Sequence, residues 1–241
     1  RCATVIVECR RELARLLATC AGVDGVVVRG EPPPKFDAYV PLLSLPGIFG
    51  TSLANIPAKV PYLRPPQPLI EQWNDELSKA GELRVGIAWQ GNPKHAADRF
   101  RSFPLARFAG IARIPGIRLY SLQMGPGREQ LTELAGQVPI TDLGDRLGDF
   151  YSTAAMVLNL DLVITCDSAP AHLAGALGVP VWVALAFSPD WRWLHDRTDS
   201  PWYPTMRLFR QSAHRDWDSV FRKLEEALTQ TVQLRTDDRF A

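Results

Sequence analysis

Residues 161–185, DLVITCDSAPAHLAGALGVPVWVAL, carry the clearest fold signal in this chain. Its first part, Leu162 to Thr165, is an apolar run with the length and β-branched content of a strand that is buried on both faces of a parallel sheet. Small and apolar residues follow, and Gly178 is typical of a helix end. The run from Val179 to Leu185 then predicts a second buried strand. The whole stretch therefore indicates a β-α-β unit.

The expected helix of this unit begins at a polar break. Asp167 and Ser168 are favourable residues for the N-cap of a helix, and Pro170 has the backbone angle of a first helical turn. The helix would open at the carboxyl edge of the sheet. There the N–H groups of Ser168, Ala169 and Ala171, together with the positive end of the helix dipole, favour a phosphate or a diphosphate.

Composition is that of an ordinary folded protein. The 241 residues are 46% hydrophobic and 22% charged, which fits one large core or two small ones. With 27 basic and 26 acidic residues the net charge is +1, which argues against a nucleic-acid partner. No apolar run reaches the roughly 18 residues of a transmembrane segment. Four cysteines without paired spacing, Cys2, Cys9, Cys20 and Cys166, predict a reducing compartment, the cytoplasm.

The first part of the chain predicts a small α/β start followed by irregular chain. Residues 3–7 and 25–28 have the pattern of strands, and residues 10–20 have that of a helix. The proline-rich stretch 31–68 predicts loops, and its apolar side chains predict that it packs against the rest of the protein. A helix is expected over 68–80.

From residue 83 onward, strands and helices alternate as in a doubly wound parallel sheet of five or six strands. The last helix is expected to be capped by Asp216. The expected strands lie at 83–89, 117–122, 138–141, 162–165, 179–185 and 207–211, and the expected helices at 104–113, 127–136, 149–159, 170–177 and 216–230.

The first strand of this sheet leads into a turn that carries positive charge. Gly91 and Asn92 form a Gly-Asn turn that can expose backbone N–H groups, and Lys94, Arg99 and Arg101 follow it. At the carboxyl edge of a sheet, such cations can hold a diphosphate opposite the helix of the central β-α-β unit. A solvated basic loop without a ligand is the alternative interpretation.

Other polar residues at this edge have two interpretations each. Asp167 and Ser168 are helix caps alone, or Ser168 also faces phosphate oxygens while Asp167 orients a loop or a sugar hydroxyl. His172 is a packed imidazole or a ligand contact. Gln123 follows a second strand, where its amide could read a base or a ribose, or belong to a plain turn. Four aromatic side chains are expected to pack rather than to bind a ring or a sugar: Trp191, Trp193, Trp202 and Tyr203. No spacing of His, Cys, Asp and Glu indicates a metal site.

Five motifs within residues 37–230 carry a resemblance to a known family. They are VITCDSAPAHLAGALGVPVWVAL, RVGIAWQGNPKH, YSLQMGPG, TDLGDRLGDFYSTAAM and SPDWRWLHDRTDSPWYPTMRLFRQ. Together they resemble glycosyltransferase family 9, the heptosyltransferase-like enzymes, and the glycosyltransferase region at the end of bacterial tetratricopeptide-repeat proteins.

This resemblance implies a GT-B fold, in which a Rossmann-like C-terminal lobe binds a nucleotide-sugar donor and an N-terminal lobe presents the acceptor. It implies that Lys94 and Arg101 stabilise the leaving diphosphate, and that Gln123 and the helix start from Asp149 to Thr153 lie near the nucleoside. The implied donor-binding residues are Gly91, Asn92, Lys94, Arg101, Gln123, Asp149, Thr153, Asp167, Ser168, Ala169 and His172.

The resemblance also implies how the chain is organised. A partial N-terminal, acceptor-side lobe is expected at 1–66, a linker helix at 67–82 and a complete C-terminal lobe at 83–241. Because the base of this family lies near the start of the N-terminal lobe, it is expected outside these 241 residues. Upstream tetratricopeptide repeats are a further expected partner.

The expected reaction is an inverting, metal-independent transfer of a sugar from a nucleotide diphosphate to an acceptor hydroxyl, without a cofactor. The acceptor would be a glycan, a lipid-linked sugar or a protein. Two alternatives remain. One is a sugar-nucleotide epimerase of the same architecture. The other is a non-catalytic module that binds a nucleotide or a protein partner.

Overall fold

The computed structural model of the chain describes residues 4–77 and 81–240, with side chains up to residue 235. Three parts of the sequence predictions lie outside this range. They are Cys2, Ala3 at the start of the first expected strand, and residues 78–80 at the end of the expected linker helix.

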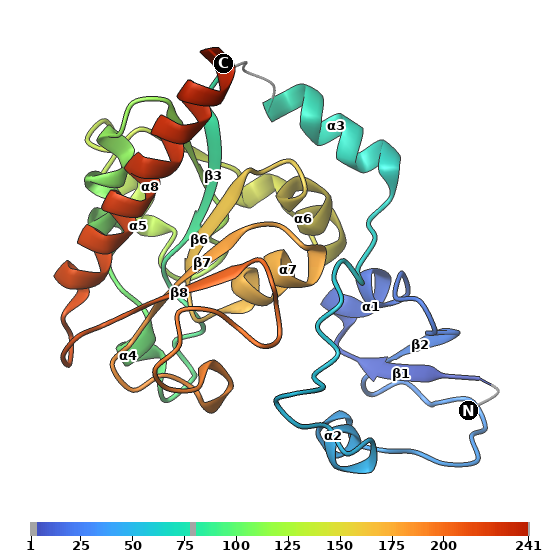
Figure 1. Cartoon of the computed structure of the whole chain (residues 1–241). Coiled ribbons are helices and arrows are strands. Elements are labelled where there is room, and N and C mark those ends of the chain that lie inside the picture. Colours follow the sequence, from blue (N-terminus) through green and yellow to red (C-terminus); the bar gives the residue numbers. More distant parts are fainter. Residues whose placement is uncertain (1–3, 78–80, 241) are drawn as a thin grey trace.

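A parallel six-stranded sheet forms the centre of the structure. Its strands are β3 (Leu83–Ala88), β4 (Ile117–Ser121), β5 (Ile140–Asp142), β6 (Leu162–Cys166), β7 (Val181–Leu185) and β8 (Met206–Arg210). Their spatial order is β5-β4-β3-β6-β7-β8, so the chain first builds outward from β3 in one direction and then outward from β6 in the other. This is the strand order of a Rossmann sheet, and it confirms the predicted doubly wound α/β fold. Figure 1 shows four of the sheet's strands, β3, β6, β7 and β8, side by side.

Two hydrophobic clusters cover the two faces of this sheet. One contains side chains of α3 (Gln67–Leu77), α6 (Phe150–Val157) and α7 (Ala169–Leu177). The other contains side chains of α8 (Trp217–Phe240) and of the 3₁₀ turns η2 (Leu105–Ala109) and η3 (Ile111–Arg113). Alternate residues of β6 enter opposite clusters, with Val163 in the first and Ile164 in the second. Figure 1 shows α8 and α7 on opposite sides of the strands.

Helix ends follow the predicted chemistry at two positions. Gly178 has a φ of 73° at the end of α7, a left-handed conformation that favours glycine. Asp216 precedes α8, and its Oδ1 accepts a hydrogen bond from the Ser219 N–H across 3.0 Å. Both predictions are therefore confirmed.

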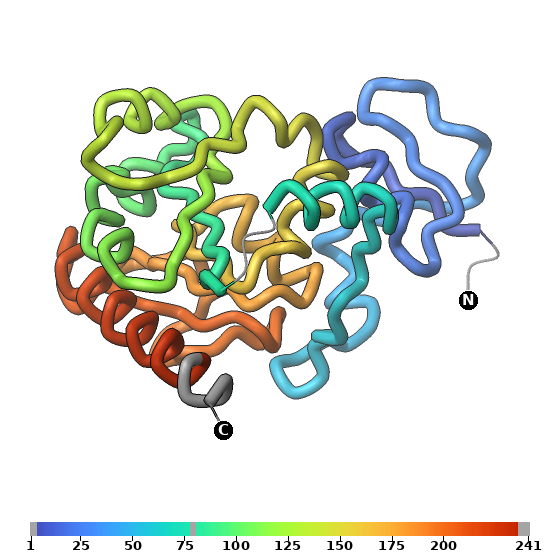
Figure 2. The backbone as a smooth tube through the Cα atoms, turned by 90° about the horizontal axis from the view of Figure 1, so that it is seen from above, coloured from blue at the N-terminus to red at the C-terminus, as the bar shows by residue number. Residues whose placement is uncertain are grey.

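The N-terminal part adds a separate small sheet, which lies to one side in Figure 2. It consists of β1 (Ile6–Cys9), α1 (Arg11–Leu17) and β2 (Gly25–Val28), and the two strands pair in parallel. The short helices η1 (Leu42–Ser44) and α2 (Leu45–Ile48) follow within the proline-rich stretch. Among the described residues, no helix combines the length and the apolarity needed to cross a membrane.

The prediction that the proline-rich stretch packs against the rest of the protein is wrong for its apolar centre. Leu43 is 88% exposed, Tyr39 84% and Phe49 73%. The reason is the size of the neighbouring structure, because two four-residue strands and one short helix offer little apolar area to cover these side chains.

Three elements of the C-terminal part also differ from the sequence predictions. The helix expected at 104–113 is replaced by η2 and η3, and the helix expected at 127–136 shortens to α5 (Glu129–Glu133). The third, α8, continues to Phe240, beyond the predicted end at 230. Pro104 and Gly110 bound η2, which explains why its apolar residues are buried without a regular α-helix.

Candidate functional site

The strand order places two predicted loops side by side. β3 and β6 are neighbours, with Ala88 paired to Thr165, and the loops that follow both strands start at the carboxyl edge of the sheet. The connection from β3 leads to one side of the sheet and the connection from β6 to the other. Rossmann-like sheets bind their ligands outside the strand ends at such a switch point. The residues predicted from the two separate motifs therefore meet at one place.

Gln123 fastens the start of the loop after β3. Its Oε1 accepts hydrogen bonds from the N–H groups of Trp89 and Gln90, each across 3.1 Å. Its Nε2 donates to the carbonyls of Gln90, across 3.0 Å, and Pro126, across 2.8 Å. The amide is thus fully used by the backbone, and its predicted contact with a nucleoside would require one of these bonds to break.

Gly91 lies where two charged side chains approach the backbone. A Cβ at this position would come within 2.8 Å of Arg101 Nη2 and would also collide with Asp98 Oδ1. Asp98 is only 5% exposed, and its Oδ1 accepts a hydrogen bond from Arg101 Nε across 3.2 Å. The absent side chain of Gly91 therefore makes room for a guanidinium that a buried carboxylate holds in place.

The turn that follows Gly91 is held by its own polar side chain. Asn92 Oδ1 accepts a hydrogen bond from the Lys94 N–H across 3.0 Å, which forms an Asx turn. Lys94 is exposed, and its ammonium forms no ion pair with the described residues. The diphosphate contacts of Asn92 and Lys94 stay predictions.

Ser168 precedes α7, but its side chain does not cap the helix. Its hydroxyl instead lies 3.2 Å from that of Thr165 and donates to the carbonyl of Cys166 across 3.3 Å. Ser168 therefore occupies the predicted N-cap position of α7 without a capping hydrogen bond from its side chain, because hydroxyl partners at the end of β6 compete with the helix N–H groups. Ala171 also differs from the expectation, since its N–H donates to the carbonyl of Ser168. The N–H of Ala169 stays a predicted phosphate contact.

Asp167 is buried, at 6% exposure, between the end of β6 and α7. Its carboxylate has no hydrogen-bond partner within the described part of the chain, so helix capping does not explain this side chain. Its oxygens are not among the fully buried, unpartnered polar atoms of the described residues, so the carboxylate keeps contact with solvent.

His172, in the first turn of α7, lies between two aromatic rings. Its Nδ1 is 3.2 Å from the hydroxyl of Tyr203, and its ring stacks on Trp193 with centroids 5.3 Å apart and planes inclined by 18°. Burial, followed by the positive charge of Arg192, lowers the pKa of His172. The imidazole is therefore neutral at pH 7.

Arg101, which follows β3, acts electrostatically on groups at the end of β6 and in α7. Its charge contributes to the pKa values of Cys166, at the end of β6, and of His172. Burial is the largest effect on Cys166 and raises its pKa to about 11, which keeps the thiol protonated. Asp98 and Asp167 oppose the positive charge near Cys166.

The start of α6 is occupied by a contact with the N-terminal part. Asp149 Oδ1 caps the helix through the Ser152 N–H, across 2.9 Å, and its Oδ2 accepts from Arg15 Nη1, also across 2.9 Å. The hydroxyl of Thr153 donates to the carbonyl of Asp149 across 2.9 Å. The predicted position of Asp149 and Thr153 near a nucleoside stays a prediction, and both polar groups already have protein partners.

Sequence reasoning missed Asp98, Arg192 and Tyr203 as neighbours of the predicted site. For Asp98 a signal existed, because its spacing of three residues from Arg101 is that of a pair on one helix face. No local signal connects Tyr203 with His172, which lie 31 positions apart. The predicted aromatic packing is confirmed for Trp193, which is 0% exposed, but Trp191 is 65% exposed.

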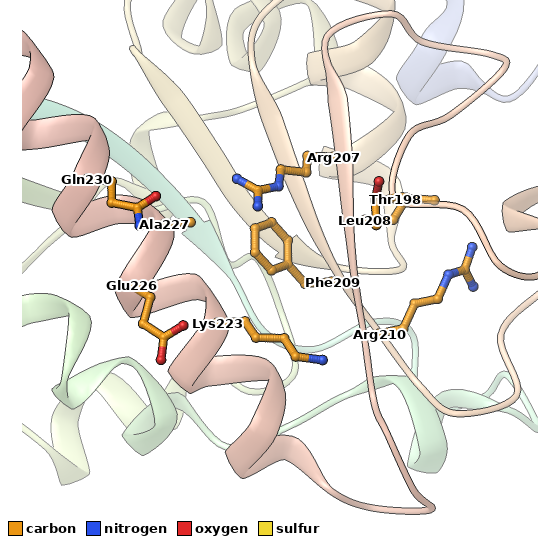
Figure 3. A pocket seen from close by; sticks show the side chains of 9 residues that line it. All are labelled: Thr198, Arg207, Leu208, Phe209, Arg210, Lys223, Glu226, Ala227 and Gln230. Atoms are coloured by element: carbon orange, nitrogen blue, oxygen red, sulfur yellow. The ribbon is translucent and has the colours of Figure 1, made fainter.

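Two surface cavities lie away from the switch point, beside the two outer strands of the sheet, β8 and β5. One of about 310 Å³ lies between β8 and α8, where Lys223, Glu226 and Gln230 of α8 lie across from Arg207 and Phe209 of β8, as Figure 3 shows. Another of about 720 Å³ lies beside β5 and α5. Within residues 4–77 and 81–235, no group of three or more His, Cys, Asp and Glu side chains is arranged to hold a metal ion.

Comparisons with known proteins give similarities in sequence and in fold. No protein-family model matches the chain. It is 29% identical over 191 residues to the protein FlbA of Caulobacter vibrioides. The matched region covers 76% of this chain and 31% of FlbA. The chain thus spans less than a third of that relative's length.

Two solved structures share the arrangement of the chain. The ADP-heptose lps heptosyltransferase II of E. coli matches with a TM-score of 0.62 and 14% identity, over 97% of this chain and 90% of that one. A glycosyl transferase of family 9 from Veillonella parvula matches with a TM-score of 0.52 and 15% identity, over 72% of this chain and 53% of that one. The resemblance carried by the sequence motifs is confirmed at the level of the fold: this chain has the GT-B-like α/β fold of heptosyltransferase structures.

Proposed function

We propose that this chain is the donor-binding part of a glycosyltransferase that moves a sugar from a nucleotide diphosphate to an acceptor hydroxyl. The observation that carries the proposal is the position of Arg101 at the switch point of the sheet. Its guanidinium is oriented by the buried Asp98, lies against the backbone of Gly91 and acts electrostatically on the end of β6 and on α7. An ordered guanidinium at this place suits a diphosphate.

The chemistry needs stabilisation of the leaving group above all. The acceptor oxygen attacks the anomeric carbon from the face opposite the diphosphate, and a new C–O bond forms with inversion. The bond from the anomeric carbon to the diphosphate oxygen breaks, and its electron pair leaves with the diphosphate. Arg101, Lys94 and the N–H of Ala169 would offset the charge that develops there without a metal ion.

The proton of the acceptor hydroxyl passes to a general base. We place this base outside the 241 residues, on an acceptor-side lobe of which residues 1–66 would be the last part. Residues 67–82 would link this part to the donor-binding lobe at 83–241. Asn92, Ser168, Ala169 and His172 would complete the diphosphate contacts.

We also propose where the two substrates bind and where in the cell the protein acts. The nucleoside would lie toward Gln123 and the start of α6, with Asp167 near a sugar hydroxyl. The acceptor would be a glycan, a lipid-linked sugar or a protein, in the cytoplasm. Tetratricopeptide repeats upstream would be a further partner.

Isothermal calorimetry of the chain with UDP, GDP and ADP, each with and without EDTA, tests the proposal. We expect one nucleotide to bind in the micromolar range, unchanged by EDTA. Arg101→Ala should weaken this binding at least tenfold, since a charge-assisted contact is worth about 1.5 to 3 kcal/mol. Arg113→Ala is the control, because Arg113 precedes β4 at the opposite edge of the sheet.

Binding of none of the three nucleotides would contradict the donor-binding proposal and favour a protein-interaction module. Equal loss in the Arg101 and Arg113 variants would contradict the assignment of Arg101. The epimerase alternative differs in its product, since such an enzyme converts a sugar nucleotide without any acceptor. Product analysis of the full-length protein with donor alone separates the two reactions.

A further inference from the structure

We propose that Tyr203 is a positioning residue that holds His172 in the tautomer with its proton on Nε2. A neutral His172 then offers a fixed N–H donor to a phosphate oxygen of a nucleoside diphosphate. The inference about the ring stands on its own geometry, whereas the identity of the ligand rests on the proposed function.

The ring of His172 has little freedom to turn. Trp193, which is fully buried, stacks on it with an interplanar angle of 18°, and Tyr203 contacts it at a centroid distance of 5.8 Å. Tyr203 is itself fixed against α7, because a Cβ at Gly175 would come within 2.5 Å of its ring. Gly175 and His172 belong to the same helix, so the two rings have a fixed relation to each other.

The distance of 3.2 Å between His172 Nδ1 and the Tyr203 hydroxyl allows two hydrogen-bond directions. Burial is the first cause that raises the pKa of Tyr203, and Tyr62 adds to it, so the phenol keeps its proton. This proton has two neighbouring acceptors, His172 Nδ1 and the Tyr62 oxygen. An imidazole nitrogen is far more basic than a phenol oxygen, so the Tyr203 O–H donates to Nδ1.

The hydrogen bond that His172 Nδ1 accepts determines whether Nε2 carries the ring proton. Burial first, and then the charge of Arg192, lowers the pKa of His172, so the ring carries one proton at pH 7. With Nδ1 occupied as an acceptor, this proton is on Nε2. The opposite tautomer would present a lone pair on Nε2, which repels a phosphate oxygen.

Nε2 has no hydrogen-bond partner among the residues that the structure describes. The charged groups that act on this ring are Arg192, Asp167, Asp190 and Arg101. Two of them are cationic and suit an anionic ligand, and Arg101 is the residue proposed to hold the diphosphate. A phosphate oxygen is therefore a suitable partner for the free N–H.

Tyr62 connects this arrangement with the N-terminal part of the chain. Its N–H donates to the carbonyl of Ala176 in α7 across 3.1 Å, and its side chain interacts with that of Tyr203. The Tyr203 oxygen can accept from Tyr62 while its proton is donated to His172.

NMR of the ¹⁵N-histidine-labelled chain tests the proposal, because two-bond ¹H–¹⁵N couplings identify the protonated nitrogen. In the wild-type protein at pH 7 we expect His172 with its proton on Nε2. In Tyr203→Phe, which keeps the ring against Gly175, we expect a mixture of tautomers. Tyr39→Phe is the control, since Tyr39 is 84% exposed. The signals of His95, His195 and His214 should stay unchanged and show that the fold is kept.

Calorimetry with the nucleotide that the wild-type chain binds gives the second readout. Tyr203→Phe should bind it about threefold to tenfold more weakly, as expected for the loss of one positioned hydrogen bond. A proton on Nδ1 in the wild-type protein, or an unchanged tautomer in Tyr203→Phe, would overturn the proposal. Absence of nucleotide binding by the wild-type chain would overturn the ligand assignment and the proposed function, while the couplings alone decide the role of Tyr203.

Discussion

Arg101 Nε lies 3.2 Å from Oδ1 of Asp98, three positions earlier in the four-residue helix α4 (Asp98–Arg101). The side chain of Arg101 is 20% exposed and that of Asp98 only 7%. A carboxylate that is nearly removed from water keeps the guanidinium in one orientation, which lowers the entropy that a ligand would have to remove on binding.

Asp98→Asn should therefore reduce nucleotide affinity almost as much as Arg101→Ala, because a neutral amide cannot hold the guanidinium by charge. The two changes should not add in the double variant, since both remove the same contact. Calorimetry of the two single variants and the double variant measures this coupling. Additive losses would mean that Asp98 and Arg101 act separately.

Gly91→Ala should weaken nucleotide binding at least tenfold, because the new methyl group would displace the side chains of Asp98 and Arg101. Gly47→Ala is the matched control. Gly47 lies in α2, has no heavy atom within 4 Å of the place of a Cβ, and is far from the switch point in the sequence. Wild-type affinity in Gly91→Ala, measured by calorimetry, would show that the guanidinium does not need this space.

Asp216 makes the stability of α8 sensitive to acid. Hydrogen bonds from Ser212 and from Ser219 lower its pKa from 3.8 to about 2. As the pH falls, the unfolded chain therefore takes up this proton first, and the contribution of Asp216 is present above about pH 4 and lost toward about pH 2. Asp216→Asn should lower the melting temperature at pH 7 and show a smaller further decrease over this acidic range.

Thermal unfolding of the wild type, Asp216→Asn and the exposed control Asp37→Asn between about pH 6 and about pH 2 checks this. The control should follow the wild type. A wild-type curve whose acid dependence equals that of Asp216→Asn would contradict the role of this cap.

Asp149 should contribute more to stability than its partner Arg15. Asp149→Ala removes both the cap of α6 and the ion pair, and a lost cap costs about 1 kcal/mol. Arg15→Ala removes the same ion pair, in which the arginine side chain is 67% exposed, together with a cation–π contact across 4.3 Å to the Tyr151 ring. At an exposed site such a cation–π contact is worth only about 0.5 kcal/mol, less than the cap. Denaturant unfolding of both variants and of the double variant should show the larger loss for Asp149→Ala. A larger loss for Arg15→Ala would contradict this order.

Much of the fold follows from local pattern. The six strands are recognisable in the sequence; β6 and β7, for example, are continuous apolar runs. The end of α7 is recognisable too, because Gly178 adopts the left-handed conformation that ends a helix. The apolar spacing of residues 104–113 predicts a helix, but the structure has two 3₁₀ turns there, since Pro104 and Gly110 favour shorter turns. The apolar content of the proline-rich stretch predicts packing that the structure does not show, because apolar content does not reveal whether a surface exists to cover it.

For the candidate site, local pattern is enough to predict which residues follow each strand: Gly91, Lys94 and Arg101 after one, and Asp167 and Ser168 after another. Chain direction and turn chemistry are local properties, so they can be read without the fold. The folded structure was needed to show that β3 and β6 are neighbours and that Tyr203 contacts His172. These relations depend on strand order and on packing between residues far apart in the chain, and no local pattern contains them.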